Sequence, residues 1–597
     1  MRCPPFYSFL TVPLSAVLLL AYSSAAMANG EQTAAGANAF IALVYHEVRS
    51  DVRDYPDPYA VDDAALVAQF AWLRGNGYSP VSVDQIVTAR AGGKALPPKS
   101  VLLTFDDAYL SFYTRVYPLL REFQYPAVVA VVGSWIDTPP GVLVHFGEKD
   151  TVSRASFPSW RQLREMADSG LVEVASHSYD LHHGVIANPQ GNLQPAATAR
   201  VYDAATGGYE TDADWRQRVQ ADLTRNAALI ERETGHRPRA IAWPYGSYND
   251  ELAQMALGLG SPVTLTLDDG VNSVDAPLNA VRRIVVGHNP SLADFADAVR
   301  GPQYPAPLRA LQVKLDDVYD ADPVRQEVNL SALLDRIQVL KPTEVFLQAY
   351  SEMNGDGIAR VVYFPNRHLA MRADLFNRVA WQITTRTDAS VFALLPVMAF
   401  HLPPDIVNDI YEDLAQHVNF AGLLFDDQIG IDAADTAMVS AALEFTQQLA
   451  ARVRAFRAPI KVARSLDVGP IVTLANKMKF SHELARLLAS SDQVVLNVSP
   501  SDGIADAALA NMTARIIRLN RESGRPDDAR KIIFMLSAAH DSADNTLQQQ
   551  MRSLQLGSML NFGYRSNDFR HDQATLINIA PALSLRTFPL PPDRIAR

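Results

Sequence analysis

The sequence predicts an α/β protein of two domains, with a distorted β/α barrel over residues 36–300 and a (β/α)8 barrel over residues 308–597. In the first half, continuous apolar runs alternate with amphipathic segments, as expected for strands buried on both faces and the helices between them. The second half holds eight apolar runs whose starts lie roughly 27 to 46 residues apart, enough for one helix and two loops each. A proline-rich join over residues 301–309 separates the halves.

The strands of the first half are predicted from short apolar runs that end in polar or glycine residues. Two helices are predicted from apolar stripes: one carries Leu66, Phe70 and Leu73 between Asp62 and Gly75, and the other begins near Trp215. The expected strands are Phe40–His46, Ser100–Asp107, Ala127–Gly133, Val172–His177, Ala240–Tyr245 and Pro262–Leu267.

The strands of the second half follow the same pattern with a more regular spacing. Several runs end in carboxylates or amides, and the carboxyl ends of barrel strands are where such folds place their sites. The expected strands are Leu311–Asp317, Glu344–Tyr350, Ser390–Phe400, Phe420–Asp427, Pro459–Ser465, Gln493–Pro500, Lys531–Ser537 and Ser558–Tyr564.

The first 28 residues are predicted to be a secretory signal peptide. Arg2 precedes an apolar run over Val12–Ala21, which is too short for a membrane span, and Ala26-Met27-Ala28 is a small-x-small cleavage site. Cys3 is the only cysteine and would leave with this segment, so the mature chain is expected to have no disulfide. No later segment is apolar enough to span a bilayer, and we expect a periplasmic protein.

The composition excludes some partners. Hydrophobic residues make up 48% and charged residues 20% of the 597 residues, which is typical of a globular protein. The net charge is −12 and no Lys/Arg-rich run is present, so no nucleic-acid partner is expected. An acidic surface suits a cationic ligand instead.

Two polar motifs at strand ends predict a metal site in the first domain. Asp106 and Asp107 end one buried strand, and His177 ends another, with His182 five residues further on. Adjacent carboxylates repel each other and resist burial unless a cation is near, and two His with one Asp leave open positions for water and substrate. The alternative is that the Asp pair is a turn or cap and that His182-His183 lies in a solvated loop.

The motifs resemble those of a known enzyme family. Thr104-Phe105-Asp106-Asp107, the His177…His182 pair and Trp243-Pro244-Tyr245-Gly246 are similar to the motifs of NodB-homology polysaccharide deacetylases, carbohydrate esterase family 4. The resemblance implies that Asp106 is the general base, that Asp107, His177 and His182 bind the metal, and that Trp243 and Tyr245 wall the acetyl pocket. The backbone N–H of Tyr245 would help to hold the oxyanion. Zn²⁺ is the expected metal, and the same donors suit Co²⁺ or Ni²⁺.

One motif departs from that family. The late general-acid His is expected in a Leu-x-His motif, but His288 lies in VVGHNPSL. Tyr45-His46-Glu47 ends the first strand instead, so we expect a permuted motif order with His46 as the acid. The alternative is a hydrogen-bonded structural His46.

The whole chain resembles the bacterial poly-β-1,6-N-acetyl-D-glucosamine N-deacetylases of biofilm polysaccharide export, in which a permuted deacetylase domain precedes a glycoside-hydrolase-like barrel. The resemblance in the second half lies in Leu315–Asp320, Val345–Tyr350, Val362–His368 with Met371–Asp374, and Asn561–Tyr564. It implies that the barrel binds the partly deacetylated, cationic polymer through Asp316, Tyr350, Asp426 and Asp427, and it suggests an outer-membrane export porin as a partner. Cleavage of the polymer by the barrel stays an open alternative, because the family's His before the Asp pair is absent and its Met-Pro-Tyr-Met-Glu type segment reads VVLNVSPS here.

Two other functions remain open at this stage. One is deacetylation of chitin oligomers or peptidoglycan, which the first half alone does not exclude. The other is a catalytically silent export factor that only grips the polymer, against which the complete set of Asp106, Asp107, His177 and His182 argues.

Overall fold

The structure is a computed structural model that describes most of the chain after the first 37 residues. The predicted signal peptide and Asp427 lie outside the described residues. Of the helices in the described part, none is long and apolar enough to cross a membrane. The described residues are 38–55, 57–147, 150–301, 306–354, 356–426, 436–457, 460–467, 484–498, 516, 528–537, 546–566 and 568–585, with the side chains of 436–440 left out.

The N-terminal domain is built on a parallel sheet that curls almost into a barrel. Its strand order is β15-β14-β9-β6-β5-β1, and each of the six predicted strands is present. The short β17 (Ile284–Val285) pairs with the outer side of β1, while Leu265 of β15 forms a single bridge to Val281. The bounds are β1 (Ala39–Tyr45), β5 (Ser100–Phe105), β6 (Ala127–Val131), β9 (Val172–Ser176), β14 (Ala240–Ala242) and β15 (Val263–Leu265).

Helices pack around this sheet through the stripes that the sequence predicted. In α2 (Asp63–Gly75) the Asp62 side chain accepts a hydrogen bond from the backbone of Ala65, and Leu66, Phe70 and Leu73 are fully buried. The long α7 (Asp212–Thr234) buries Trp215 and its stripe in the same way. The other helices are α3 (Val83–Arg90), α4 (Tyr117–Phe123), α5 (Gly133–Asp137), α6 (Trp160–Asp168), α8 (Asp250–Gly258) and α9 (Leu292–Arg300).

The C-terminal domain is a closed parallel barrel of eight strands, as predicted. Each of the eight apolar runs overlaps one strand, because a strand buried between the barrel interior and the helix layer needs apolar side chains on both faces. The strands are β18 (Arg309–Lys314), β19 (Glu344–Gln348), β23 (Ser390–Leu395), β24 (Gly422–Phe425), β25 (Lys461–Asp467), β26 (Gln493–Val498), β27 (Ile532–Ser537) and β28 (Phe562–Arg565).

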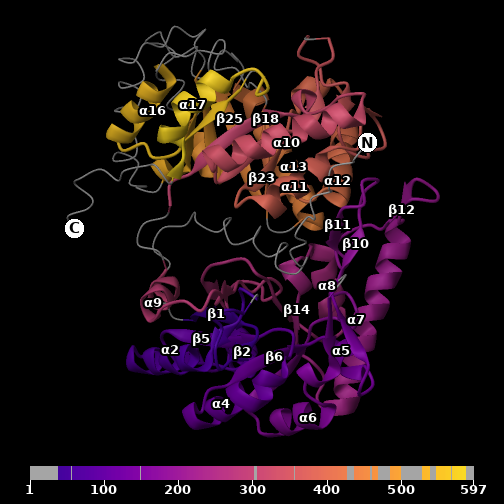
Figure 1. The fold of residues 1–597 in the computed structure, drawn as a ribbon, viewed down its shortest axis with the longest axis vertical. Helices are drawn as coiled ribbons and strands as arrows, with labels where there is room; N and C mark the ends of the chain where they lie inside the picture. The colour runs from indigo at the N-terminus through magenta and orange to yellow at the C-terminus, as the bar shows by residue number, and fades with distance from the viewer. Residues whose placement is uncertain are drawn as a thin grey trace, which may run out of the picture.

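Helices surround the barrel, and a small sheet follows β19. This sheet consists of β20 (Tyr350–Ser351), β21 (Val361–Val362) and β22 (Ala370–Met371). Figure 1 shows the barrel above the N-terminal domain. The helices are α10 (Pro323–Leu340), α11 (Phe376–Arg386), α12 (Pro404–His417), α13 (Thr436–Phe456), α16 (Thr546–Leu556) and α17 (Gln573–Leu583).

Two hairpins that the sequence did not predict extend from the N-terminal domain to the barrel (Figure 1): β10–β11 (Gly184–Ile186, Leu193–Pro195) and β12–β13 (Tyr202–Asp203, Gly208–Tyr209). The side-chain amide of Gln194 donates to Asn377 of α11 at 2.7 Å, and the Tyr209 hydroxyl donates to the carboxylate of Asp374. The ring of Tyr209 also packs against His417, with centroids 4.8 Å apart. These three contacts connect the barrel to the segment of the N-terminal domain that follows His182.

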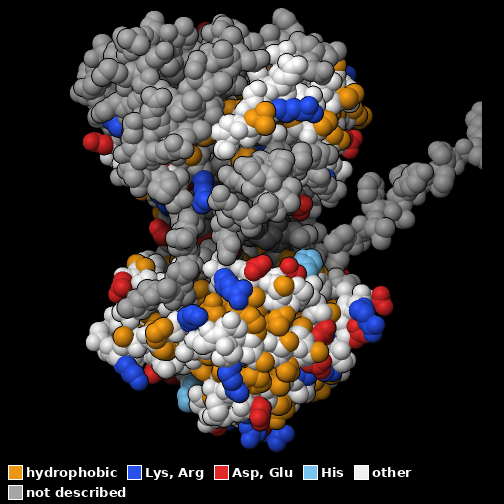
Figure 2. All heavy atoms as spheres, turned by 90° about the vertical axis from the view of Figure 1, so that its left-hand side faces the viewer, with side chains coloured by type: hydrophobic (Ala, Val, Ile, Leu, Met, Phe, Trp, Pro, Cys, Tyr) orange, Lys and Arg blue, Asp and Glu red, His pale blue; other side chains and the backbone are white. Residues whose placement is uncertain are grey.

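The outer surface carries charges of both signs. On the described part of the face in Figure 2, Lys and Arg side chains of the N-terminal domain lie scattered among Asp, Glu and apolar side chains. No continuous basic stripe is visible on that part of the face.

Candidate active site

Two backbone bends at strand ends bring the predicted metal ligands together. Asp107 and Ala108, just beyond β5, have φ values of 68° and 47°, so the chain leaves the strand geometry between Asp106 and Asp107. Ser178, directly after His177, has a φ of 69°. Neighbours on a regular strand point to opposite faces, and the bend at Asp107 is what lets both carboxylates face one site.

Asp107, His177 and His182 form a buried group that can hold a metal ion. Asp107 Oδ1 lies 3.5 Å from His177 Nε2 and 3.3 Å from His182 Nε2, and the three ligand atoms all lie within 4.8 Å of one another. Ligand bonds of about 2.0–2.1 Å at a tetrahedral angle would place two ligand atoms about 3.3 Å apart. The observed separations therefore suit a single ion of that size.

The hydrogen bonding and charge of this group also suit a cation. His177 Nδ1 lies 2.8 Å from the carbonyl oxygen of Ala242, which orients Nε2 toward Asp107. Burial lowers the pKa of His182 to about 4, so this ring is neutral near pH 7 and presents a lone pair. Burial opposes ionisation of Asp107, but the neighbouring His182 and His177 outweigh it and hold its pKa below the usual range. In the described part of the chain, Asp107 Oδ1 has no hydrogen-bond partner.

Asp106 is held by an arginine that the sequence did not reveal. Arg283 donates to both carboxylate oxygens of Asp106, at 2.7 and 2.8 Å, and a further bond joins it to the Thr104 hydroxyl. Burial alone would raise the pKa of Asp106, but the charge of Arg283, followed by that of His177, lowers it overall. Arg283 directly precedes β17 and is 177 residues from Asp106, so no local motif could have linked them.

His46 lies at the end of β1 beside this group. It is 8% exposed, its ring centroid is 5.2 Å from that of Tyr59, and its Nδ1 is buried with no hydrogen-bond partner in the described residues. A positive charge on His46 would lower the pKa of both Asp106 and Asp107. His288, the alternative acid, is exposed and its backbone N–H donates to the Pro58 carbonyl.

Aromatic rings enclose the outer side of the group. The His182 ring centroid lies 4.6 Å from Tyr245 and 4.9 Å from Trp135, with Phe146 of the β7 strand (Leu143–Phe146) at 6.2 Å. Tyr245 has a φ of 59°, a bend that carries its ring toward His182. Trp135 and Phe146 were not predicted, since neither belongs to a recognisable motif.

Trp243 occupies a different position from Tyr245. It is 1% exposed and belongs to a hydrophobic cluster with Leu181 and Trp215. It therefore supports the loops of the site from within the core.

The predicted polar residues of the barrel lie at the ends of its strands. Asp316 accepts hydrogen bonds from Tyr363 at 2.6 Å and Arg372 at 2.5 Å, and Asp426 accepts one from Ser465 at 2.8 Å. Tyr350 is 5% exposed in β20. Burial, with the charge of Asp568 as a second cause, raises the pKa of Asp317 to about 7.

Comparisons with known proteins agree with both halves of this description. A family model described as polysaccharide deacetylase matches residues 93–264, and one described as hypothetical glycosyl hydrolase family 13 matches residues 312–407 and 436–565. The fold and these matches define a polysaccharide deacetylase, a hydrolase of amide bonds, joined to a glycoside-hydrolase-like barrel.

The family follows from a relative that matches nearly the whole chain. The poly-β-1,6-N-acetyl-D-glucosamine N-deacetylase of Escherichia coli (strain K12) is 34% identical over 628 residues, covering 92% of this chain and 93% of the relative. The protein of that name from Staphylococcus epidermidis is 24% identical over 263 residues, 42% of this chain and 80% of its own. The chain belongs to the poly-β-1,6-N-acetyl-D-glucosamine N-deacetylase family.

Two solved structures are similar to the separate halves. The BpsB deacetylase domain from Bordetella bronchiseptica is 48% identical, with a TM-score of 0.38, and the match covers 41% of this chain and 95% of that one. The PgaB (BpsB) glycoside hydrolase domain from the same organism is 28% identical, with a TM-score of 0.41, over 47% of this chain and 99% of that one.

Proposed function

We propose that this protein removes acetyl groups from poly-β-1,6-N-acetyl-D-glucosamine in a metal-dependent reaction. The observation that carries the proposal is the convergence of Asp107, His177 and His182 on one point, with Asp106 held ionised beside them. The substrate is inferred from the name of the E. coli relative, whose match spans both domains. Enzymes of the chitin or peptidoglycan type would need only the first domain.

Each residue of the site has its own role in the proposed reaction. A bound divalent ion would polarise the acetamide and acidify water. These donors suit Zn²⁺ best, with Co²⁺ or Ni²⁺ as alternatives. Asp106, kept as a carboxylate by Arg283, accepts a proton from the water that attacks the carbonyl carbon. His46 donates a proton to the nitrogen as the C–N bond breaks, which releases acetate and leaves an amine. Tyr245 and Trp135 enclose the space next to His182 and would limit the access of bulk water to it.

For the barrel we propose binding of the partly deacetylated polymer. Each deacetylated sugar carries an ammonium group, and the carboxylates of Asp316 and Asp426 at the strand ends attract such a ligand. Asp427 and Tyr350 are further members of the proposed surface. Asp317 has the raised pKa expected of a proton donor, and cleavage of the polymer would require it or a neighbour to act with a second carboxylate.

The place of action follows from the substrate. We propose that the chain is exported by its N-terminal segment to the periplasm, where it would act on the polymer before an outer-membrane porin exports it.

A linkage comparison tests the proposed function. The full chain, loaded with Zn²⁺, is incubated with fully acetylated β-1,6 and β-1,4 glucosamine oligomers, and mass spectrometry counts the acetyl groups lost. We expect loss from the β-1,6 oligomers, and none with Asp106→Asn, which keeps the three ligands. Equal turnover of β-1,4 oligomers would point to a chitin deacetylase, and no turnover of either would overturn the proposal.

The same Asp106→Asn chain separates binding from cleavage in the barrel. It is incubated with a partly deacetylated β-1,6 polymer, and chain length is followed by size-exclusion chromatography. Retention on the polymer with unchanged chain length is the expected result. Shortened chains would instead show a hydrolase.

A further inference from the structure

A polar cavity of the C-terminal domain extends from the residues that precede β26 and β27 to Arg464 of β25, which pairs with Phe425 of β24. It has a volume of about 260 Å³ and lies between α13, β25 and the segment that leads into β26. Asp492 directly precedes β26, and Lys531 directly precedes β27. A single buried water needs only about 10–15 Å³, so this space can take a small molecule.

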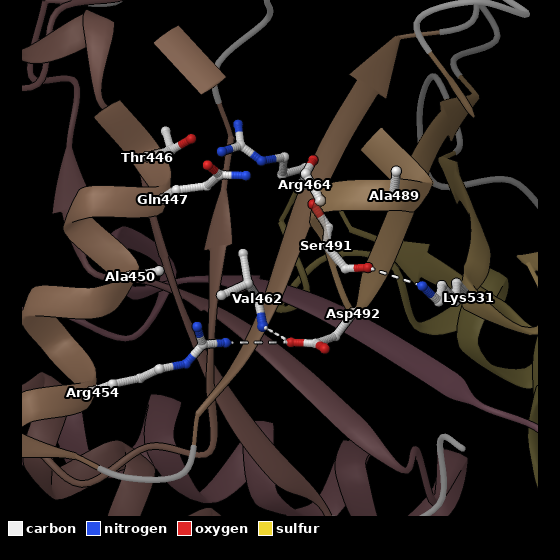
Figure 3. Close-up of a pocket in the computed structure, with 11 residues that line it drawn as sticks. Thr446, Gln447, Ala450, Arg454, Val462, Arg464, Ala489, Ser491, Asp492 and Lys531 are labelled. Atoms are coloured by element: carbon white, nitrogen blue, oxygen red, sulfur yellow. Dashed lines mark hydrogen bonds and ion pairs between the residues drawn. The ribbon is translucent and has the colours of Figure 1, made fainter. Parts of the chain in front are cut away.

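The charged residues that line this cavity are mainly cations, in a chain whose net charge is −12. Arg454, Arg464 and Lys531 line it with one carboxylate, that of Asp492 (Figure 3). Asp492 accepts a hydrogen bond from the Val462 backbone at 2.8 Å and lies 3.7 Å from Arg454, so its charge faces one side of the cavity.

Lys531 supplies the cation on the other side. Its ammonium donates to the carbonyl oxygens of Leu488 at 2.9 Å and Ser491 at 3.5 Å. Within the part of the chain that the structure describes, it forms no ion pair with a carboxylate. These carbonyls lie at the end of the helix over residues 484–490 and carry only partial negative charge, so the ammonium keeps a net positive charge.

A hydroxyl in the same wall also lacks a partner. Ser491 is 7% exposed, and its Oγ has no hydrogen bond to any described residue. A buried hydroxyl that forms no hydrogen bond destabilises a protein, and such groups are rare unless water or a ligand satisfies them. The backbone carbonyl of Ser491 contacts Lys531, so this residue and the cation line the same cavity.

We propose that this cavity is a binding site for a small oxyanion, a phosphate or carboxylate group, held by Lys531, Arg454 and the Ser491 hydroxyl. An ammonium, a guanidinium and a hydroxyl donor around one space are the set that recognises such groups. The site is separate from the deacetylase centre and does not depend on the proposed function.

Isothermal titration of the full chain with sodium phosphate and sodium acetate tests this, with sodium chloride at equal ionic strength as the blank. We expect saturable binding of at least one oxyanion and none of chloride. Tighter binding of phosphate would assign a phosphoryl ligand, and tighter binding of acetate a carboxylate ligand. The absence of saturable binding for both oxyanions would overturn the proposal.

Variants show whether the binding belongs to this cavity. Lys531→Met should weaken it about tenfold or more, the usual effect of losing one charge-assisted bond. Ser491→Ala should weaken it about two- to tenfold, and folding should persist because this hydroxyl contacts no other polar group. Arg452→Met removes the same charge from α13 at a residue that pairs with Glu412, outside the cavity lining, and should bind like the wild type. Unchanged affinity in both Lys531→Met and Ser491→Ala would place the anion elsewhere and overturn the proposal.

Discussion

Replacing Arg283 by Met tests the pair that keeps Asp106 ionised. Arg283 is 0% exposed and the Asp106 side chain 4% exposed, so the substitution leaves a buried carboxylate without its cation. Removing one partner of such a pair typically lowers the free energy of unfolding by about 3–5 kcal/mol. Rates should fall about 100-fold or more near pH 7, because loss of the Arg283 charge shifts the proposed base toward its protonated form and removes the two hydrogen bonds that orient it.

The loss of stability in Arg283→Met should be larger at higher pH. In the wild type the pKa of Asp106 lies below its ordinary value of 3.8, so its contribution is present above that pH and is lost as pH falls through the folded pKa. Without Arg283, burial raises the pKa of Asp106, and the folded variant gains stability relative to the unfolded chain as pH falls. The difference between wild type and variant should therefore be larger at pH 7.5 than at pH 5.

The free energy of unfolding is measured by urea denaturation monitored with circular dichroism at both pH values. The rate is measured as acetate release at the same pH values. Arg282→Met is the matched control, since Arg282 is exposed and does not contact Asp106. Wild-type stability and rate in Arg283→Met would refute the reasoning.

Four further predictions concern the metal group, the domain interface and the barrel. His182→Ala should reduce bound Zn²⁺, measured by mass spectrometry of the metal, and abolish acetate release; retained metal would contradict the ligand assignment. Tyr209→Phe should lower the free energy of unfolding by about 1–3 kcal/mol at pH 8 and less at pH 5. Burial raises the pKa of Asp374 to about 6, so at pH 8 the variant leaves a buried, ionised carboxylate without its donor, whereas at pH 5 the protonated carboxyl loses only a weaker hydrogen bond. Burial lowers the pKa of His417 from 6.5 to about 4, so wild-type stability should fall as pH drops through this range, and His417→Gln should flatten that slope in urea unfolding. Gly422→Ala should lower the melting temperature, since the new Cβ would lie 2.3 Å from the Phe392 ring; an unchanged value would show that the ring moves freely.

The barrel and the metal ligands could be predicted because each leaves a local pattern. Strands buried on both faces read as apolar runs, and their carboxyl ends meet at one edge, so Asp107 and His177 were expected near each other. The structure places them 3.5 Å apart, at the nearest ligand atoms. The bend at Asp107 is a requirement of this arrangement, since without it the two adjacent carboxylates would face opposite sides.

The partners of those residues were decided only by the tertiary structure. Arg283 reaches Asp106 from the segment before β17, Trp135 and Phe146 reach His182 from α5 and β7, and Tyr209 meets the barrel from a hairpin. These contacts join residues far apart along the chain, and a single arginine or tryptophan carries no periodicity that would mark its partner. The pattern of buried residues in a strand or helix depends on residues that are neighbours in the sequence, so it can be predicted from the sequence. The pairing of side chains from distant segments depends on how the folded elements pack against one another.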